Sequence, residues 1–298
     1  MVSFPRTLRR LAGLAVLVAL GAVGCSELDS WQRQAIFSPV AEQQRWWRDP
    51  PAGTQVFDLQ VARGETVRAW YWPSPVPHAP AVLYLHGARW NLNGSAFRME
   101  AWTRLGYSVL AIDYRGFGAS SPRLPSERSA LQDAQAALQE LARRQPDPAR
   151  RFVYGHSLGG AIAIDLMSQP RQPEVAGLIV ESSFTSIAAM MTQYKWGKVP
   201  GAAWLVTQPF DSLGKLARLS IPLLLLHGTE DRIVPDSMSD ELYAAAILVP
   251  PELRRLVKIQ GGSHSGGVRS GAPYNQAVSD FVRDAGKARR VADRAVSG

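Results

Sequence analysis

A serine in the middle of the chain has the surroundings of a catalytic nucleophile. Ser157 is the central residue of a Gly-x-Ser-x-Gly pattern, which follows a run of apolar and aromatic residues and precedes an alanine- and isoleucine-rich segment. Between a strand and a helix, the small residues of such a pattern permit a tight turn that exposes the serine hydroxyl. A serine hydroxyl is a poor nucleophile until an oriented histidine accepts its proton, so the pattern predicts partners further along the chain.

The later part of the chain contains residues suited to be these partners. An apolar run ends at Leu226 and is followed by a loop with Glu230 and Asp231, either of which can orient a histidine. Of the five histidines only His264 follows this loop, and it lies in a glycine- and serine-rich segment. The chain order of serine, carboxylate and histidine predicts a triad for acyl transfer.

Acyl transfer also requires N–H donors for the oxyanion of the tetrahedral intermediate. In a strand-turn-helix setting one donor is the backbone amide after the nucleophile, which here belongs to Leu158. The second is expected from the loop after the apolar run 81–85, where Ala88 is the candidate. The next residue, Arg89, can be interpreted as a group that faces an anionic head group, but we favour a solvated surface residue.

Short apolar runs that are typical of buried parallel strands precede these loops. Five of them lie at Ala81–Leu85, Ser108–Ile112, Arg151–Tyr154, Gly177–Val180 and Pro222–Leu226, and a last strand is expected at Arg255–Ile259. Patterns typical of helices cover residues 125–144, 158–168, 236–248 and 274–290. Alternating runs at residues 56–61 and 67–72 predict an antiparallel hairpin. The sequence therefore predicts an α/β fold with a mainly parallel sheet and helices on both faces.

Six motifs in this order resemble the α/β-hydrolase superfamily, and more closely the single-domain serine hydrolases related to the fungal Bem46 protein and the α/β-hydrolase domain-containing protein 13. They are Leu-His-Gly (85–87), Asp-Tyr-Arg-Gly-Phe-Gly (113–118), Tyr-Gly-His-Ser-Leu-Gly-Gly (154–160), Glu-Ser-Ser-Phe-Thr-Ser (181–186), His-Gly-Thr-Glu-Asp-Arg-Ile-Val-Pro (227–235) and Gly-Ser-His (262–264). The resemblance covers about residues 55–290. It implies an α/β-hydrolase fold, hydrolysis of a carboxylic ester or related acyl compound without cofactor, and Asp231 as the triad carboxylate. Glu230 is then interpreted as a solvated loop residue.

A short lid segment is expected at about residues 184–219. It holds several large apolar residues, namely Phe184, Met190, Met191, Tyr194, Trp196 and Trp204. These side chains are equally suited to line an acyl pocket and to form ordinary core helices, and the sequence leaves both interpretations open. The segment is too short for a large cap domain, which favours short or medium acyl chains, monoacylglycerols or lysolipids.

The N-terminus is typical of an export signal. Arg6, Arg9 and Arg10 precede a run of apolar or small residues that ends at Gly24, directly before Cys25. The run is too short to span a bilayer unaided. Its end is similar to the lipobox of bacterial lipoproteins, which implies a signal peptide at residues 1–24, lipidation of Cys25, a lipid-anchored tether at 25–54 and a hydrolase domain at 55–298. An ordinary signal segment and an unexported chain remain alternatives.

Because the residue after the cysteine is Ser26 rather than aspartate, the lipoprotein resemblance implies a lipid anchor in the outer membrane, on the periplasmic side of the cell envelope. The mature enzyme is therefore expected to meet a membrane through its N-terminal anchor.

Composition excludes several other classes of protein. The 298 residues are 46% hydrophobic and 19% charged, which is typical of a packed globular chain. The only cysteine, Cys25, excludes intrachain disulfides and cysteine-rich metal centres, so no metal site is expected. Of the net charge of +8, three charges lie at the N-terminus and others in a mixed tail at residues 287–294, and no recognition motif accompanies them, so no nucleic-acid partner is expected.

The sequence as a whole favours a serine hydrolase that acts on a small-molecule or lipid acyl substrate. In this hypothesis Ser157 attacks, His264 is base and then acid, Asp231 orients His264, and the amides of Ala88 and Leu158 bind the oxyanion. A thioesterase, amidase or peptidase would use the same triad. A catalytically silent hydrolase-fold binding protein is the non-enzyme alternative. Oligomeric state is not predicted.

Overall fold

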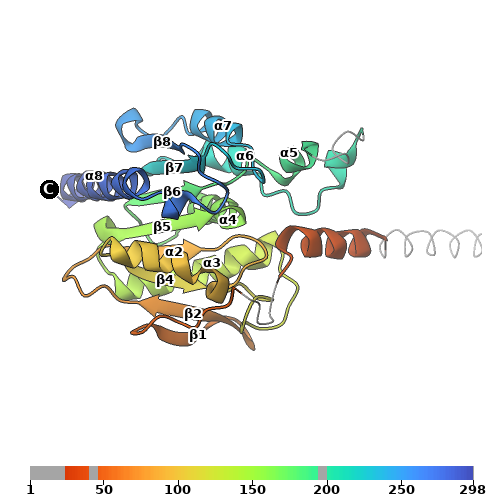
Figure 1. Ribbon diagram of the computed structural model, residues 1–298, viewed down its shortest axis with the longest axis horizontal. Helices are drawn as coiled ribbons and strands as arrows, with labels where there is room; N and C mark the ends of the chain where they lie inside the picture. Colours follow the sequence, from red (N-terminus) through yellow and green to blue (C-terminus); the bar gives the residue numbers. More distant parts are fainter. Residues whose placement is uncertain (1–23, 40–45, 194–199, 298) are drawn as a thin grey trace, which may run out of the picture.

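A computed structural model of the chain describes residues 24–39, 46–193 and 200–297, and it is built around one mixed sheet of eight strands (Figure 1). In the sheet the strand order is β1-β2-β4-β3-β5-β6-β7-β8. β2 pairs antiparallel with β1 and β4, and all other neighbours are parallel. The strands are β1 (Gln55–Ala62), β2 (Glu65–Trp72), β3 (Ala81–Leu85), β4 (Ser108–Ile112), β5 (Arg151–His156), β6 (Gly177–Glu181), β7 (Leu223–Gly228) and β8 (Arg254–Ile259). The predicted α/β-hydrolase fold is confirmed.

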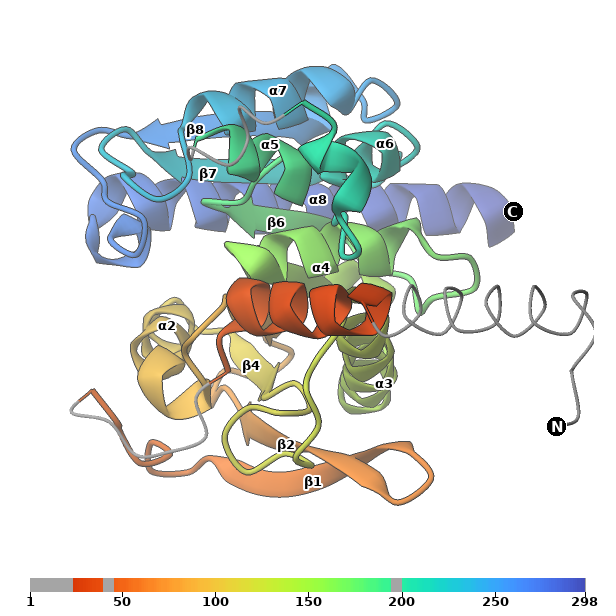
Figure 2. The same ribbon diagram turned by 90° about the vertical axis from the view of Figure 1, so that its right-hand side faces the viewer.

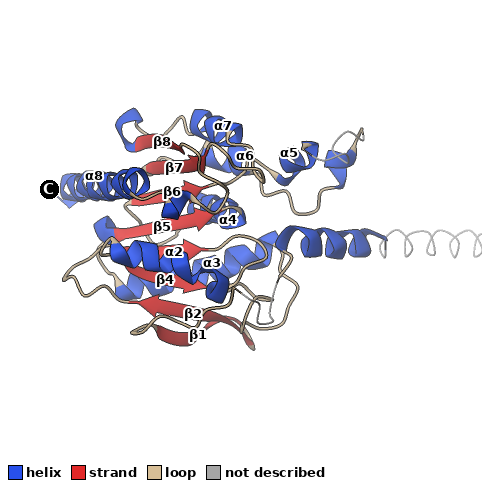
Figure 3. Ribbon diagram, in the orientation of Figure 1, coloured by secondary structure: helices blue, strands red, loops and turns tan. Residues whose placement is uncertain are grey.

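Helices cover both faces of the sheet (Figure 3). One face packs against α3 (Glu127–Arg144), α4 (Leu158–Ser168), α6 (Ser212–Leu216) and α7 (Ser237–Ala245), and the short α5 (Ile187–Thr192) lies at its margin. The other face packs against α2 (Leu92–Arg104) and α8 (Ala272–Ser297). Short 3₁₀ helices occur at η1 (Pro148–Arg150), η3 (Ala202–Leu205), η4 (Pro251–Leu253) and η5 (Gly267–Arg269). The side chains of successive strand residues alternate between these two cores, which is why the central strands are apolar throughout.

Two helices illustrate what local sequence does and does not specify. The start of α3 has a strong signal, because the Ser126 hydroxyl accepts from the Ser129 amide and Ser129 bonds back to the Ser126 amide. α2 was not expected from the sequence. Its buried face includes Asn93, Ser95 and Arg98, so the apolar stripe that marks an amphipathic helix is interrupted.

Residues 24–37 form a helix that lies on the hydrolase domain and was not predicted (Figure 2). At its end Phe37 is fully buried, with its ring 6.5 Å from that of Phe117 and 5.8 Å from that of Phe210. Earlier in the helix, Gln32 donates to the carbonyl of Leu205 and accepts from the amide of Thr207. The segment therefore connects the lid region with the core of the domain.

The predicted signal peptide falls on residues 1–24, and all of these except Gly24 lie outside the described residues. Cys25 is exposed at the beginning of the helix formed by residues 24–37. In the described part of the chain, none of the helices has both the length and the apolar character needed to span a bilayer. The proposed division at residue 55 stays a prediction.

Candidate active site

The strand register brings the loops that carry the candidate residues to one edge of the sheet. β3 and β5 pair Leu85 with Gly155, and β5 and β6 pair His156 with Glu181. β7 and β8 pair Gly228 with Ile259. Because these strands are parallel, the loops that follow their carboxyl ends leave the sheet side by side, as expected for a site in an α/β fold.

Ser157 occupies a sharp turn between β5 and α4. Its backbone has φ 55° and ψ −122°, a strained conformation for a residue with a side chain. The turn is possible because its neighbours are glycines: a Cβ on Gly155 would lie 2.2 Å from the carbonyl oxygen of Gly159, and one on Gly159 would lie 2.0 Å from that of Leu85. The Ser157 amide donates to the carbonyl of Glu181 at 2.9 Å, which ties the turn to the neighbouring strand.

Asp231 and His264 meet although 33 residues separate them. The Nδ1 of His264 donates to the Oδ2 of Asp231 at 2.7 Å, and the Asp231 side chain is fully buried. This bond fixes the tautomer in which the Nε2 of His264 is free to accept a proton. Glu230 is exposed, and only its backbone amide is held, by the carbonyl of Gly262. The structure therefore pairs His264 with Asp231 and leaves Glu230 as a surface residue.

The environment of Asp231 keeps it anionic. Burial alone would raise its pKa, but hydrogen bonds from His227 and His264 and the amide of Val234 outweigh that effect and hold the pKa of Asp231 below its usual range. Its Oδ1 accepts from the amides of Ile233 and Val234, each at 2.9 Å, and the Nε2 of His227 lies 3.2 Å from Oδ2. Both carboxylate oxygens are thus fully engaged, which fixes the orientation of the side chain that holds His264.

His156, the residue before the serine, helps to place His264. Its Nε2 donates to the carbonyl of His264 at 2.8 Å, and the two imidazole rings are 5.0 Å apart. Burial holds the pKa of His156 well below its usual value, and the positive charge of Arg98 acts in the same direction. His156 therefore stays neutral and connects the loop that carries His264 directly to the turn that carries Ser157.

The loop after β3 lies against Ser157. A Cβ on Gly87 would lie 3.2 Å from the Cβ of Ser157. Two later amides in this loop are occupied, since Arg89 donates to the carbonyl of Phe37 and Trp90 donates to that of Ala88, both at 2.9 Å. Within the described residues, the amides of Ala88 and Leu158 donate to no protein acceptor. These are the two amides that the sequence predicts for the oxyanion.

A buried polar network beneath the turn was missed by the sequence analysis. The Nη1 of Arg98 bonds to the Oε1 of Glu181 at 3.0 Å and to the hydroxyl of Tyr154 at 2.9 Å. The other carboxylate oxygen of Glu181 accepts from Tyr154 at 2.6 Å and from Tyr274 at 3.1 Å. Glu181 also supplies the carbonyl that holds the Ser157 amide. A glutamate at the end of an apolar strand was a weak signal, but nothing in the sequence pairs it with Arg98.

The lid residues have different environments. Phe184 is buried and its ring lies 6.5 Å from that of Phe210, and Met190 is partly buried against the same core. Trp204 is 92% exposed. Tyr194 and Trp196 lie outside the described residues. Phe184 and Met190 therefore serve the core, and Trp204 does not line a pocket in this conformation.

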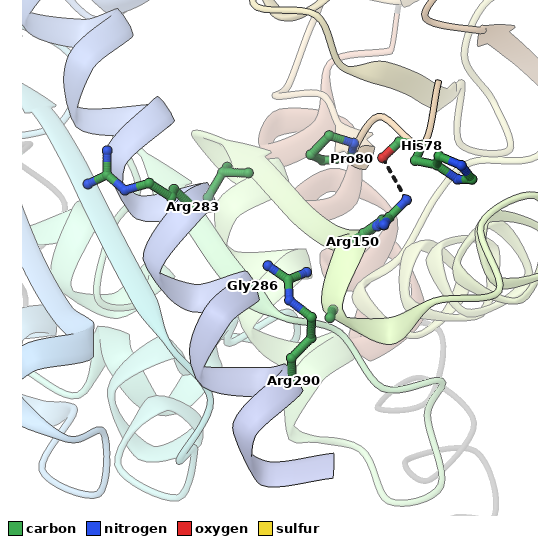
Figure 4. A pocket seen from close by; sticks show the side chains of 8 residues that line it. His78, Pro80, Arg150, Arg283, Gly286 and Arg290 are labelled. Carbon is green, nitrogen blue, oxygen red and sulfur yellow. Dashed lines mark hydrogen bonds between the residues drawn. The ribbon is translucent and has the colours of Figure 1, made fainter. Parts of the chain in front are cut away.

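One cavity is remote from these residues. It has a volume of about 310 Å³ and lies at the amino ends of β3 and β5, the opposite edge of the sheet from Ser157 (Figure 4). Its lining is His78, Pro80, Ala149, Arg150, Val282, Arg283, Gly286 and Arg290. A second cavity, of about 210 Å³, lies at the carboxyl edge beside the loop after β3. Among the described residues, no cluster of three or more histidine, cysteine or acidic side chains is arranged to hold a metal ion.

Comparisons with known proteins agree with this architecture. The family model described as "Serine aminopeptidase, S33" matches residues 77–215. The uncharacterized protein MT2364 of Mycobacterium tuberculosis is 35% identical over 259 residues, which cover 86% of this chain and 87% of that protein. The lysophosphatidylserine lipase ABHD12 of Rattus norvegicus is 30% identical over 231 residues, which cover 72% of this chain but only 54% of ABHD12.

Among solved structures, the Pyrococcus furiosus esterase Pf2001 is similar with a TM-score of 0.65 and 19% sequence identity, over 83% of this chain and 96% of the esterase. At that identity the likeness concerns the fold alone. The finer kinship with the Bem46 and α/β-hydrolase domain-containing protein 13 group stays a prediction. From the fold, the family model and the 35% identity with MT2364 over most of both chains, we conclude that the chain belongs to the α/β-hydrolase superfamily, in the family described as serine aminopeptidase, S33.

Proposed function

We propose that the protein is a serine hydrolase that cleaves carboxylic esters through an acyl-enzyme intermediate. The observation that carries the proposal is the 2.7 Å bond between His264 and buried Asp231, on loops that meet the strained turn of Ser157. In acyl transfer the Oγ of Ser157 attacks the ester carbonyl while the Nε2 of His264 takes its proton. His264 then donates this proton to the leaving alcohol, and water releases the acyl group by the same route.

We propose that the backbone amides of Ala88 and Leu158 bind the oxyanion. The amide of Leu158 is at the first turn of α4, where backbone N–H groups have no partner within the helix. The Arg89 amide donates to the carbonyl of Phe37. This bond helps to hold the adjacent Ala88 in position. Preorganised donors of this type are among the largest contributions to catalysis by such enzymes.

For the substrate we propose short or medium acyl esters, monoacylglycerols or lysolipids. The region between β6 and β7 contains only short helices, α5, η3 and α6, and no cap domain among the described residues. ABHD12, with which the chain shares 30% identity, is named a lysophosphatidylserine lipase, and this supports a lipid ester.

A peptidase or amidase is the second candidate, and the description of the matching family as serine aminopeptidase favours it. An aminopeptidase binds the free ammonium of its substrate, for which an accessible carboxylate is suited. Asp231 and Glu181 are buried and already accept hydrogen bonds from protein groups, so neither is free to bind an ammonium, while Glu230 beside Asp231 is exposed. We rank the ester first because ABHD12 is named a lipase.

Active-site labelling followed by a substrate panel tests the proposed function. We expect a fluorophosphonate probe to label the full chain at Ser157, and the Ser157→Ala variant to remain unlabelled. The panel compares esters, thioesters and aminoacyl amides of matched acyl length, with the highest kcat/KM expected for an ester. Absence of labelling would favour the catalytically silent binding protein, and a preference for aminoacyl amides would favour the peptidase.

We further propose that Cys25 carries a lipid anchor, so that the enzyme works beside a bilayer in the cell envelope, at the outer membrane. Two observations support this. An apolar run precedes the exposed Cys25. Large apolar side chains lie exposed on the helix of residues 24–37 and on the segment around Leu205, which Gln32 joins by a hydrogen bond. Trp31 is 67%, Trp204 92% and Leu205 62% exposed. Aromatic and aliphatic side chains of this kind favour the membrane interface.

The Cys25→Ser variant tests the anchor. In a Gram-negative host we expect the wild type to fractionate with membranes and to carry added acyl mass, since two or three chains give stable anchoring where one does not. The variant should lose both properties and keep the hydrolase domain folded, because the exposed thiol makes no packing contact that the fold requires. A wild-type protein without acyl mass would contradict the lipidation proposal and leave the catalytic one intact.

A further inference from the structure

The cavity of about 210 Å³ at the carboxyl edge of the sheet is not part of the triad and has a distinctive lining. Its walls combine four aromatic side chains, two guanidinium groups and one glycine, which are Trp46, Trp47, Trp90, Phe97, Arg48, Arg269 and Gly94. Aromatic walls with cationic groups suit an organic ligand that bears an anionic group.

One wall of this cavity, Trp90, belongs to the loop after β3, whose Ala88 amide is proposed to bind the oxyanion. Trp90 is two residues after Ala88 and its amide donates to the Ala88 carbonyl at 2.9 Å. Gly87, directly before Ala88, approaches Ser157 so closely that a Cβ there would lie 3.2 Å from the serine Cβ. The cavity therefore begins within a few residues of the position at which the ester carbonyl is attacked.

Another part of the lining, Arg269, comes from the segment that follows His264. Arg269 ends η5, five residues after His264, and its amide donates to the carbonyl of Gly266 at 2.9 Å. η5 is anchored in the interior, because Gly267 packs against the carboxylate of Glu181. His264 donates its proton to the leaving group, so a cavity between its loop and the oxyanion loop is placed to hold the leaving group rather than the acyl chain.

The charge of Arg269 at this cavity is not neutralised by a carboxylate. Within the described residues no carboxylate lies within 4.0 Å of Arg269, whose guanidinium is 4.4 Å from the centre of the Phe97 ring. Stacking on a ring leaves the N–H groups at the edge of the guanidinium available to an anion. Arg48 has one loose partner, Glu100, at 3.6 Å. The neighbouring Arg89 is exposed as well.

The aromatic walls are held in place by close packing. The rings of Trp46 and Trp90 stack with their centres 5.9 Å apart, and the ring of Trp46 lies over Gly94 at a distance where a Cβ would be 2.5 Å away. Trp90 also contacts Phe97 edge to face at 6.1 Å. The cavity is thus a preformed feature, with the glycine leaving room for an indole.

We infer that this cavity binds a phosphate group in the leaving half of the ester substrate, so that the enzyme prefers acyl esters of phosphate-bearing alcohols to neutral ones. The inference rests on the proposed ester hydrolysis and specifies its substrate class. Arg269 is the principal phosphate ligand and Arg48 the second. Guanidinium groups bind phosphate oxygens through paired, charge-assisted hydrogen bonds.

Two esters that differ only in the phosphate test the inference. One is a monoacylglycerol and the other the corresponding monoacylglycerol phosphate, with the same medium acyl chain and below the micelle concentration. We expect kcat/KM to be at least about tenfold higher for the phosphate ester. Arg269→Gln should reduce this ratio by about fivefold or more, mainly through KM, because the contact binds ground state and transition state alike. Arg269→Lys should restore part of the ratio.

The matched control is Arg63→Gln, which removes the same charge from an exposed arginine in the turn between β1 and β2. It should leave the ratio unchanged, which separates a local contact from net charge. If the wild type cleaves both esters equally, or if Arg269→Gln slows both to the same extent, the inference is wrong and the proposed ester hydrolysis stands. If neither ester is cleaved in a Ser157-dependent manner, the proposed function fails and the inference with it.

Discussion

Replacing Ser157 by alanine is expected to lower kcat for ester hydrolysis by at least about 10³-fold, because no acyl-enzyme can form without the hydroxyl. His264→Ala should cost about as much, since a serine without its base is not activated. Because the two residues act as one unit, the double variant should be little slower than either single variant. The measurement is kcat and KM for the best ester of the substrate panel.

The outcome depends on the three variants being folded, which circular dichroism and thermal unfolding check. Ser157 sits in a strained turn that glycines make possible, so removal of its hydroxyl leaves the backbone determinants intact. Ser157→Ala with more than a tenth of wild-type activity would contradict the assignment of the nucleophile. Additive losses in the double variant would contradict the joint action of Ser157 and His264.

The second large effect is expected for Asp231→Asn, with a loss in kcat on the order of 10³- to 10⁴-fold. In the wild type one carboxylate oxygen accepts from the amides of Ile233 and Val234 and the other from His264, with His227 nearby. An asparagine has one acceptor oxygen, so either the backbone pair or the histidine pair loses its acceptor. His264 then has no anionic partner to fix its tautomer and orientation.

Glu230→Gln is the matched control, because it neutralises the exposed carboxylate next to Asp231 and should leave kcat within about twofold of wild type. The depressed pKa of Asp231 adds a pH test. A carboxyl group with a folded-state pKa below its unfolded value contributes stability above pH about 4 and loses it as the pH falls further. The decrease in the free energy of unfolding caused by Asp231→Asn should therefore be constant between about pH 6 and 9. An Asp231 variant with near-normal kcat would exclude it from the triad.

The fold followed from the sequence because its central strands are buried on both faces. Runs such as Ser108–Ile112 are apolar throughout and coincide with β4, since a parallel strand covered by helices has no solvent-facing side. α2 escaped prediction for the opposite reason. Its buried face holds Arg98, whose partners Tyr154 and Glu181 come from strands far along the chain.

The candidate site was predictable to the extent that local motifs determine it. The Gly-x-Ser-x-Gly turn and the chain order of Asp231 and His264 are visible in the sequence, and the structure brings the last two within 2.7 Å. The choice between Asp231 and Glu230 required either a resemblance or coordinates, because both lie in the same loop. The network of Arg98 and Glu181 could not be predicted, since contact across 83 residues leaves no periodic signal.

The helix of residues 24–37 has a consequence for how modular the protein is. A chain trimmed to begin at Gln55 would keep all eight strands and the triad, yet it would lose the carbonyl of Phe37 that holds the Arg89 amide. It would also expose the buried rings of Phe117 and Phe210, which Phe37 covers. The helix of residues 24–37 is therefore also a support of the loop after β3. This helix and the rest of the domain are not independent units, because the contacts between them reach the loop that lies against Ser157.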